Sequence, residues 1–472
     1  MVSRTDAQPC ALPPAGLPLT AFEEFMLLDD RPSHPMAIVA RFDFADGPPP
    51  PGLAEAFGAA LRQEPLLTAR IVRPPRGRPR WVAAEPPALE VAEIAAGESV
   101  PPLRRIDPAR GPMIGATLVE RASDWSIVVA VHHAACDGLG LLGFVERWFL
   151  RAAGREGRRG RDPADTLAAV DKRGRVAGSW REFLGLLPRL AKGLEGVGQF
   201  VSREVASLTD RPPGAGASSG TEGAAADAWR PTILSATLDE REVERLERRA
   251  RAAGVMVNDL LMTSFVATLG RHLEGRDPRH GGAAWIRLAT PLSLRTKSDH
   301  RLPAANRVSM VFFDRRAADR RDEAALARSF REEMDVIRTH ALGHVLPLSL
   351  EVGRWLPGGL RRTVARPQPQ STAVLSNLGG CFVRSPLLDD AGCLRVGAGR
   401  LAGWWMVPPL RPGTALAAAT HETRGRRTVA FHVDAARVPP ARARAWLAEL
   451  VESLARDDRP VETAPGAEVA AR

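Results

Sequence analysis

Cysteine is scarce in this chain of 472 residues, which contains only four: Cys10, Cys136, Cys381 and Cys393. No two of them form a Cys-x-x-Cys pair, and their spacing is irregular. Zinc sites and disulfide frameworks both depend on such patterns, so the sequence indicates neither, and we predict no metal site. Isolated thiols of this kind suit a reducing compartment.

Long apolar runs are also missing. No uninterrupted apolar stretch reaches the roughly eighteen residues that a membrane-spanning helix needs. The first residues, 1–6, lack the charged-then-apolar pattern of a signal peptide. We therefore expect a cytoplasmic protein.

Charge is unbalanced toward basic residues, with 65 Lys plus Arg against 55 Asp plus Glu and a net charge of +10. Such a surplus favours an anionic partner, for example a nucleotide-bearing cofactor, a membrane surface or nucleic acid. However, Tyr is absent while Arg, Ala, Gly and Pro are abundant, a pattern that coding bias explains equally well. The net charge therefore selects no partner, and we expect no nucleic-acid ligand.

The length of the chain exceeds that of a single hydrophobic core, so two domains or two fused subdomains are expected. Hydrophobic residues at 44% and charged residues at 25% are typical of a globular protein. A segment rich in Pro, Gly, Ala and Ser at 211–226 indicates the connection. We predict an N-terminal subdomain over 1–165, a linker with an amphipathic helix over 166–230, and a C-terminal subdomain over 231–472.

Hydrophobic periodicity predicts alternating helices and strands. Helices are expected at 20–28, 53–62, 141–153, 180–208, 239–253, 258–273 and 441–454. Strands are expected at 36–44, 67–72, 115–121, 126–133, 232–238, 285–289, 307–313, 373–376, 416–420 and 428–433. The first helix opens on a capping box, with Thr20 followed three residues later by Glu23.

The most informative segment is His132-His133-Ala134-Ala135-Cys136-Asp137-Gly138, between a predicted strand and a predicted helix. Neighbouring side chains of a strand face opposite sides, so His132 and His133 are poorly placed to share a metal ion. One imidazole can instead face a cavity as a general base, although histidine pairs at strand ends are more often structural. Asp137 precedes Gly138 in a turn, where a carboxylate can pair with an arginine and hold the loop.

This segment resembles the HHxxxDG motif of the chloramphenicol acetyltransferase-like superfamily and matches all its fixed positions. The superfamily includes nonribosomal peptide condensation domains, alcohol acyltransferases and the wax ester synthase/diacylglycerol acyltransferases. Residues 106–113 resemble the D-x-x-x-G-P-L segment of condensation-type proteins. Residues 18–36 and 254–261 are similar to the opening and to the G-V-T-V-N-D helix start of the wax ester synthase group.

The resemblance implies an α/β fold of two chloramphenicol acetyltransferase-like subdomains, each a mixed sheet with flanking helices, that meet at a central tunnel. It implies that His133 is the general base, without a covalent intermediate, and that an arginine holds Asp137. The best local match for this arginine is Arg295, at the end of a P-V-x-x-R-like segment. Asn306 resembles the asparagine of the family's G-N-x-x-S stretch, although Ala305 replaces the glycine.

A second stretch, Ser376-Asn377-Leu378-Gly379-Gly380, resembles the S-N-x-x-G segment of the alcohol acyltransferases. The Ser376 hydroxyl, the Asn377 amide and the backbone around Gly379 can stabilise an oxyanion or position a substrate oxygen, whereas the alternative is a polar turn after a buried strand. The S-N-V-P-G-P pattern of the wax ester synthases is not kept after Asn377. The apolar residues 403–409 fit either a tunnel wall or simple core.

The resemblance implies an O-acyltransferase that moves an acyl group from acyl-CoA to the hydroxyl of a lipophilic acceptor, such as a long-chain alcohol or diacylglycerol. One alternative is a stand-alone condensation-type enzyme that uses acyl-carrier protein thioesters and forms an ester or amide, and another is a non-catalytic scaffold. We expect no bound cofactor, with acyl-CoA or acyl-carrier protein as co-substrate. The amphipathic run 180–208 fits peripheral contact with a membrane or lipid droplet, or a helix that crosses between the subdomains.

Overall fold

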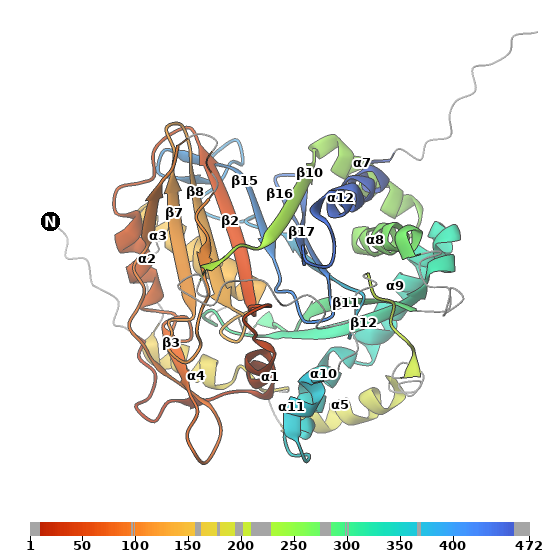
Figure 1. Ribbon diagram of the computed structural model, residues 1–472, viewed down its shortest axis with the longest axis horizontal. Helices are drawn as coiled ribbons and strands as arrows, with labels where there is room; N and C mark the ends of the chain where they lie inside the picture. Colours follow the sequence, from red (N-terminus) through yellow and green to blue (C-terminus); the bar gives the residue numbers. More distant parts are fainter. Residues whose placement is uncertain are drawn as a thin grey trace, which may run out of the picture.

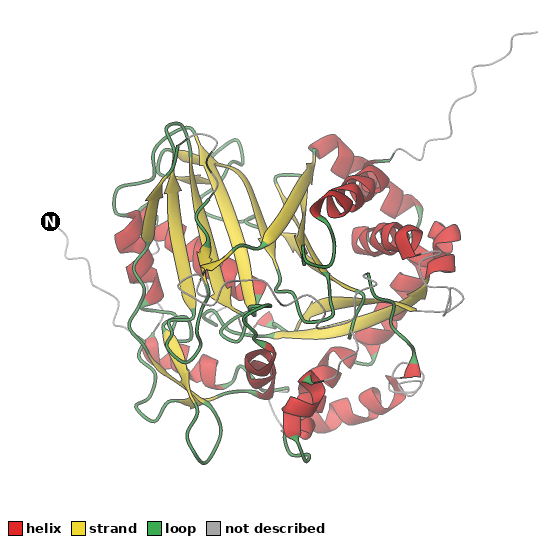
Figure 2. Ribbon diagram, viewed as in Figure 1, coloured by secondary structure: helices red, strands yellow, loops and turns green. Residues whose placement is uncertain are grey.

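The computed structural model describes residues 10–95, 98, 100–155, 162–176, 180–193, 202–208, 228–273, 285–297, 299, 302–365 and 370–456. Within these residues, two six-stranded mixed sheets stand side by side (Figure 1). Figure 2 shows that helices flank the pair of sheets on its outer sides. This arrangement confirms the predicted class of two α/β subdomains, each built on a mixed sheet.

The first sheet carries the histidine pair. Its strands lie in the order β14 (Arg395–Val396), β15 (Gly399–Val407), β2 (Ala37–Ala45), β8 (Trp125–His132), β7 (Ile114–Glu120) and β5 (Glu90–Glu93). Only β5 and β7 pair in parallel. All eight residues of β8 are buried, because helices α2 (Leu53–Leu61) and α3 (Gly138–Ala152) cover one face of the sheet and the second sheet approaches the other.

The second sheet is built from the C-terminal half. Its strands lie in the order β10 (Thr232–Leu238), β17 (Arg426–Val433), β16 (Leu416–Thr423), β13 (Ala373–Gly380), β11 (Trp285–Ser293) and β12 (Val308–Arg316). The central strand β13 is parallel to both of its neighbours. The face of the second sheet that points away from the first sheet packs on α7 (Glu240–Ala252), α8 (Val257–Leu273), α9 (Glu323–Thr339) and α12 (Pro440–Ala455).

The remaining elements lie outside the two six-stranded sheets. They are β1 (Leu17–Pro18), α1 (Ala21–Asp29), β3 (Ala69–Val72), β4 (Arg80–Ala83), β6 (Leu103–Arg104), α4 (Pro163–Asp171), α5 (Trp180–Gly193), β9 (Ala228–Trp229), η2 (Ala317–Arg321), η3 (Leu342–His344), α10 (Val345–Gly353) and α11 (Gly359–Val364). Strands β1, β4 and β3 form a small sheet, and β6 pairs with β9.

The strand β15 joins the two halves of the molecule. It follows β13 in the chain, yet it pairs with β2 in the first sheet. The Trp404 ring of β15 stacks on the His421 ring of β16, with 3.5 Å between the centroids. Trp404 Nε1 donates to Thr423 Oγ1 at 3.0 Å, and His421 Nε2 donates to the Trp404 carbonyl at 3.0 Å. Ring stacking and hydrogen bonds of Trp404 therefore hold the two sheets together.

Most predicted elements are present, with small differences at their ends. The capping box is confirmed, because Glu23 N donates to Thr20 Oγ1 at 3.2 Å and Thr20 N donates to Glu23 Oε2 at 2.9 Å. Helix α3 begins earlier than predicted, at Gly138, because Asp137 caps it. Strand β8 ends at His132 rather than at His133, because the chain turns there.

Two elements that position or support the site are not predicted by the sequence pattern. Residues 404–407 of β15 are all apolar, since one face packs in the core of the first sheet and the other faces the second sheet, and such a strand lacks alternation. Helix α9 carries its apolar residues at helical spacing between many charges. This spacing is a usable signal that the sequence analysis did not assign to an element.

The linker is only partly visible. Residues 211–226 lie outside the described residues, so the boundaries 1–165, 166–230 and 231–472 stay predictions. The amphipathic helix begins at Trp180 as predicted, with Pro188 inside α5. Residues 194–201 lie outside the described residues, and the expected helix does not continue over 203–208, where Val205 forms a β-bridge with Trp285. Arg189 of this helix donates to the Thr339 carbonyl at the end of α9, with Nη2 at 2.7 Å and Nε at 3.0 Å.

Among the described residues, no single helix is both long and apolar enough to cross a membrane. Helices α7 and α8 meet the length and composition requirement only as a pair, and they are bent by 100° relative to each other.

Buried histidines make the stability of the fold depend on pH. Burial lowers the pKa of His421 to about 3 and that of His432 to about 4, whereas an unfolded histidine has a pKa of about 6.5. Between these values the unfolded chain binds more protons, so the free energy of unfolding should fall as the pH falls from 6.5. Urea denaturation between pH 7 and pH 5 measures this decrease.

The variant His421→Gln keeps a donor near the Trp404 carbonyl but does not titrate. Its free energy of unfolding should fall less steeply with pH, by up to about 1.4 kcal/mol per pH unit. An unchanged slope would show that His421 is not held neutral by the fold.

Candidate active site

The histidine pair lies where β8 leaves the sheet. His132 N donates to the Met113 carbonyl at 2.9 Å, and His133 N donates to the Met36 carbonyl at 2.7 Å. These bonds tie the end of β8 to both neighbouring chain segments. These backbone hydrogen bonds therefore fix the position of the His133 main chain without any side chain of the loop.

The His133 imidazole is oriented by the loop that follows it. Its Nδ1 lies 3.1 Å from the Cys136 carbonyl oxygen, which can only accept a hydrogen bond. Nδ1 must then carry the proton, and Nε2 keeps a free lone pair. Burial lowers the pKa of His133, against the opposing effect of the Asp137 carboxylate, so the imidazole is neutral at pH 7. A neutral imidazole with a free Nε2 can accept a proton.

His132 is almost fully buried. Its Nδ1 accepts a hydrogen bond from Ala134 N at 3.1 Å, and its Nε2 lies 3.9 Å from Asp30 Oδ1. Asp30 is itself held by Met36 N and by Arg105 Nη2, each at 2.9 Å. His132 therefore supports the start of the loop. Among the described residues, no group of three His, Cys, Asp or Glu side chains is arranged to hold a metal ion.

The Asp137 carboxylate joins the loop to the C-terminal half. Gly140 N donates to Oδ1 at 2.7 Å, Arg295 Nη2 donates to Oδ1 at 2.8 Å, and Arg307 N donates to Oδ2 at 2.8 Å. The ion pair with Arg295 that the resemblance implied is present. Since both oxygens accept protein N–H groups, Asp137 anchors the loop and is not available as a second base.

Asn306 binds the backbone of the same loop. Its Nδ2 donates to the carbonyls of His133 and Ala134, each at 2.8 Å. Asn306 therefore supports the loop backbone, with alanine and not glycine at position 305. The Ala305 carbonyl accepts a hydrogen bond from Arg295 Nη2 at 2.9 Å.

The buried charged pair Glu64–Arg147 contacts the chain at Ala304 and was not predicted from the sequence. Ala304 N donates to Glu64 Oε2 at 2.6 Å, and Arg147 Nη2 donates to Glu64 Oε1 at 2.5 Å. Glu64 is completely buried between α2 and α3. The partners are far apart in the chain, so no local motif marks them.

The residues of the second predicted stretch, 376–380, have different roles in the site. The Ser376 side chain lies on the cavity next to His133. Asn377 is committed to structure, because its Nδ2 donates to Asn258 Oδ1 and its Oδ1 accepts from Gly379 N, both at 2.9 Å. Gly379 has a φ of +69°, which favours glycine. Ser376 is thus the better placed of these residues to contact a substrate oxygen.

Gly138 lines the same cavity and lies close to Met406 and Leu378. A Cβ atom at position 138 would lie 3.2 Å from Met406 Sδ and 3.3 Å from Leu378 Cδ2. Such a contact is tight, so a larger residue would push these side chains aside. Glycine at this position keeps α3 close to β15 and β13.

The cavity that contains His133 has a volume of about 90 Å³ and lies between the two sheets. It combines the predicted residues His133, Asp137, Gly138, Ser376 and Asn377 with residues of both halves. The other lining residues are Ile38, Leu139, Pro291, Ser293, Val308, Leu378, Met406, Pro408 and Ala419. Arg295, Asn306 and Gly379 are not lining residues and act through the backbone or through Asp137.

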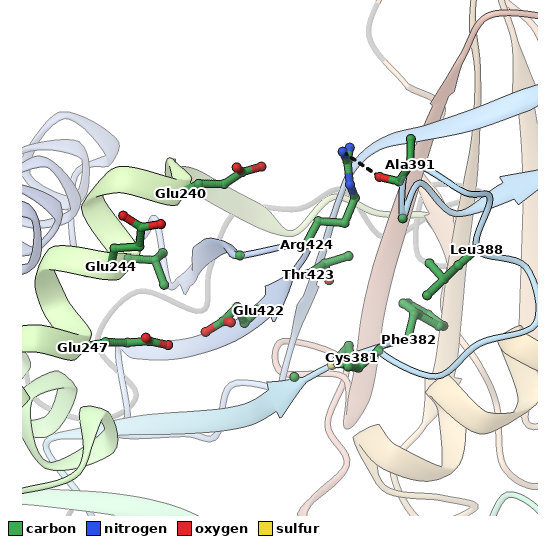
Figure 3. A pocket seen from close by; sticks show the side chains of 15 residues that line it. Glu240, Glu244, Glu247, Cys381, Phe382, Leu388, Ala391, Glu422, Thr423 and Arg424 are labelled. Carbon is green, nitrogen blue, oxygen red and sulfur yellow. Dashed lines mark hydrogen bonds between the residues drawn. The ribbon is translucent and has the colours of Figure 1, made fainter. Parts of the chain in front are cut away.

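A larger cavity of about 590 Å³ lies between α7 and the hairpin of β16 and β17 (Figure 3). Its walls carry glutamates from α7 and from β16, together with Cys381. Burial raises the pKa of Cys381 to about 12, so its thiol stays protonated. The residues that line this cavity include no histidine, and none of the predicted site residues belongs to it.

A scan against models of protein families and a search of curated proteins found no match. Solved structures do match. The first condensation domain of the CDA synthetase has a TM-score of 0.64 at 16% identity, covering 95% of this chain and 98% of that one. SgcC5 from Streptomyces globisporus has a TM-score of 0.62 at 17% identity, covering 94% and 100%.

The starter condensation domain of rhizomide synthetase, in complex with C8-CoA and Leu-SNAC, has a TM-score of 0.58 at 15% identity, covering 95% and 97%. At these identities the likeness concerns the fold. The chain has the fold of condensation domains, which confirms the resemblance at that level.

The anchoring by Asp137 can be tested by its effect on stability. Asp137→Ala removes a helix cap and leaves Arg295 and two backbone N–H groups without their acceptor, so unfolding should become easier by about 3–5 kcal/mol. Asp162→Ala is a matched control, because Asp162 caps α4 through Ala164 N alone. This control should cost about 1 kcal/mol. Equal losses in urea denaturation would contradict the anchoring role.

Proposed function

We propose that this protein transfers an acyl group from a thioester to an acceptor hydroxyl or amine, with His133 as the general base. The observation that carries the proposal is the hydrogen bond from His133 Nδ1 to the Cys136 carbonyl, which leaves Nε2 unprotonated beside a cavity. An arrangement of this kind suits proton removal from an acceptor. The condensation-domain fold of the chain supports the same chemistry.

In the proposed reaction, His133 Nε2 takes the proton of the acceptor while the acceptor oxygen or nitrogen bonds to the thioester carbon. The carbon–sulfur bond then breaks, and the proton passes from His133 to the leaving thiolate. The imidazole ends neutral, so no covalent enzyme intermediate is needed. The Ser376 hydroxyl, on the same cavity, can donate to the carbonyl oxygen as negative charge develops.

The acceptor is proposed to be uncharged near its reacting atom. Asp137 is the one charged side chain among the residues that line the cavity, and N–H donors already occupy both of its oxygens. A charged acceptor would find no counter-ion there, and burial of an unpaired charge is costly. A hydroxyl on an apolar body, as in the leading sequence hypothesis, meets this condition.

Two classes of thioester are proposed as the acyl donor. An acyl-CoA donor is supported by the neighbour in complex with C8-CoA. A carrier-protein thioester is supported equally by the condensation domains of synthetases among the neighbours. Contact with a membrane or lipid droplet and a cytoplasmic location stay predictions from the sequence.

The role of His133 predicts the outcome of a simple assay. Release of free thiol from acyl-CoA, in the presence of long-chain alcohols, diacylglycerol or amines, should fall by about a hundredfold or more in His133→Ala. His272→Ala, whose ring pairs with Glu449 far from the cavity, is the matched control and should keep its activity.

The donor is identified in the same assay. Turnover with a carrier-loaded donor alone would favour the condensation-type enzyme. If neither donor is consumed, or if His133→Ala equals the unchanged protein, the catalytic proposal fails and the scaffold alternative gains.

The pKa of His133 predicts the pH profile. Because burial lowers this pKa below 6.5, kcat/KM should stay level from pH 8 to about pH 6.5 and fall only at lower pH, as Nε2 becomes protonated. The Asp137 carboxylate raises the pKa of His133, so in Asp137→Asn the fall should move to still lower pH. A fall that begins above pH 7 would contradict a buried, neutral base.

A further inference from the structure

The cavity beside His133 is small, and most of the residues that line it are apolar. Its volume of about 90 Å³ is less than that of an apolar cavity that holds benzene, which is about 150 Å³. Ile38 and Met406 come from the first sheet, and Ala419 comes from the second. Residues of both halves therefore line the space, and a volume of this size holds only a few carbon atoms.

Met406 of β15 and Leu378 of β13 both line this cavity. Met406 is buried on β15, paired in register with Ala40 of β2. Leu378 lies on β13, at a bulge that the Asn377 hydrogen bonds fix. Both side chains lie close to Gly138, within 3.2–3.3 Å of the place where its Cβ would be. Since strand pairing holds Met406 and hydrogen bonds hold the neighbour of Leu378, the wall does not depend on a mobile loop.

A second, more polar cavity adjoins the first at Val308 of β12. Val308 lines both cavities, and Phe22, which also lines the polar one, presents its ring to His133 at 6.3 Å between centroids. The polar cavity is lined by Arg175, Arg307 and Glu351 among others. Polar portions of a donor or acceptor suit this side, whereas an acyl tail, which carries no polar atom beyond its carbonyl, suits the apolar side.

We propose that the apolar cavity takes the acyl tail of the donor and that Met406 and Leu378 limit this tail to a short one, of about two to four carbons. This inference rests on the proposed acyl transfer and narrows its donor class.

The test compares pantetheine thioesters that differ only in the acyl chain: acetyl, butyryl, octanoyl and dodecanoyl. For the unchanged protein, kcat/KM should be at least about tenfold higher with butyryl than with dodecanoyl, because each methylene that finds no room costs binding in the transition state. Equal use of the two donors would overturn the inference. Selectivity that follows the chain of the acceptor, and not that of the donor, would overturn it as well.

Variants locate the limit. Met406→Ala removes Cγ, Sδ and Cε from the wall, and the ratio of octanoyl to butyryl turnover should rise by about tenfold or more. Leu378→Ala should act in the same direction and provides an independent variant if Met406→Ala folds poorly. Met334→Ala is the matched control, because Met334 is buried on α9 in the other core. An unchanged ratio in both Met406→Ala and Leu378→Ala would contradict the assignment.

Binding separates this inference from the proposed function. A ligand that binds the folded protein raises its Tm, so thermal unfolding with each thioester reports the chain length that is accepted without any acceptor present. No thiol release from any donor, together with a larger rise in Tm for butyryl than for dodecanoyl, would defeat the catalytic proposal but keep the limit. Turnover without chain-length preference would do the reverse.

Discussion

The rest of the site depends on the Asp137 carboxylate. It accepts N–H groups from three segments: the first turn of α3, the Arg295 side chain after β11, and the backbone before β12. One side chain thus caps a helix of the first half and holds two segments of the second. Because buried carboxylates are costly unless every oxygen is paired, the two halves must meet in one arrangement for Asp137 to be satisfied. The cavity beside His133 exists only in that arrangement.

The local order of the motif could be predicted from sequence because it depends on neighbours in the chain. A strand, a tight loop and a capped helix place His133 and Asp137, and the P-x-x-x-R segment located Arg295. The orientation of the imidazole could not be predicted, since it rests on a carbonyl of the loop, that of Cys136. The Glu64–Arg147 pair and the exchange of β15 into the first sheet were also hidden, because they join residues distant in sequence.

Burial has two consequences that act together at His133. It lowers the pKa of the imidazole and so keeps a base available at neutral pH, and a thioester bound in the cavity of about 90 Å³ would leave little room there for water. The same close packing leaves little room around Met406 and Leu378. A neutral base and a narrow cavity therefore arise from one cause, the tight meeting of two sheets at β15. The larger acidic cavity at α7 shares neither property.

The central claim is that His133 is a neutral imidazole protonated on Nδ1, with Nε2 free to accept a proton. Nitrogen-15 NMR of histidine-labelled protein tests it most directly, with the His133 signals identified by their loss in His133→Gln. The account predicts a protonated Nδ1 and an unprotonated Nε2 at pH 7, with titration below pH 6.5. A proton on Nε2, or a doubly protonated ring at pH 7, would contradict it.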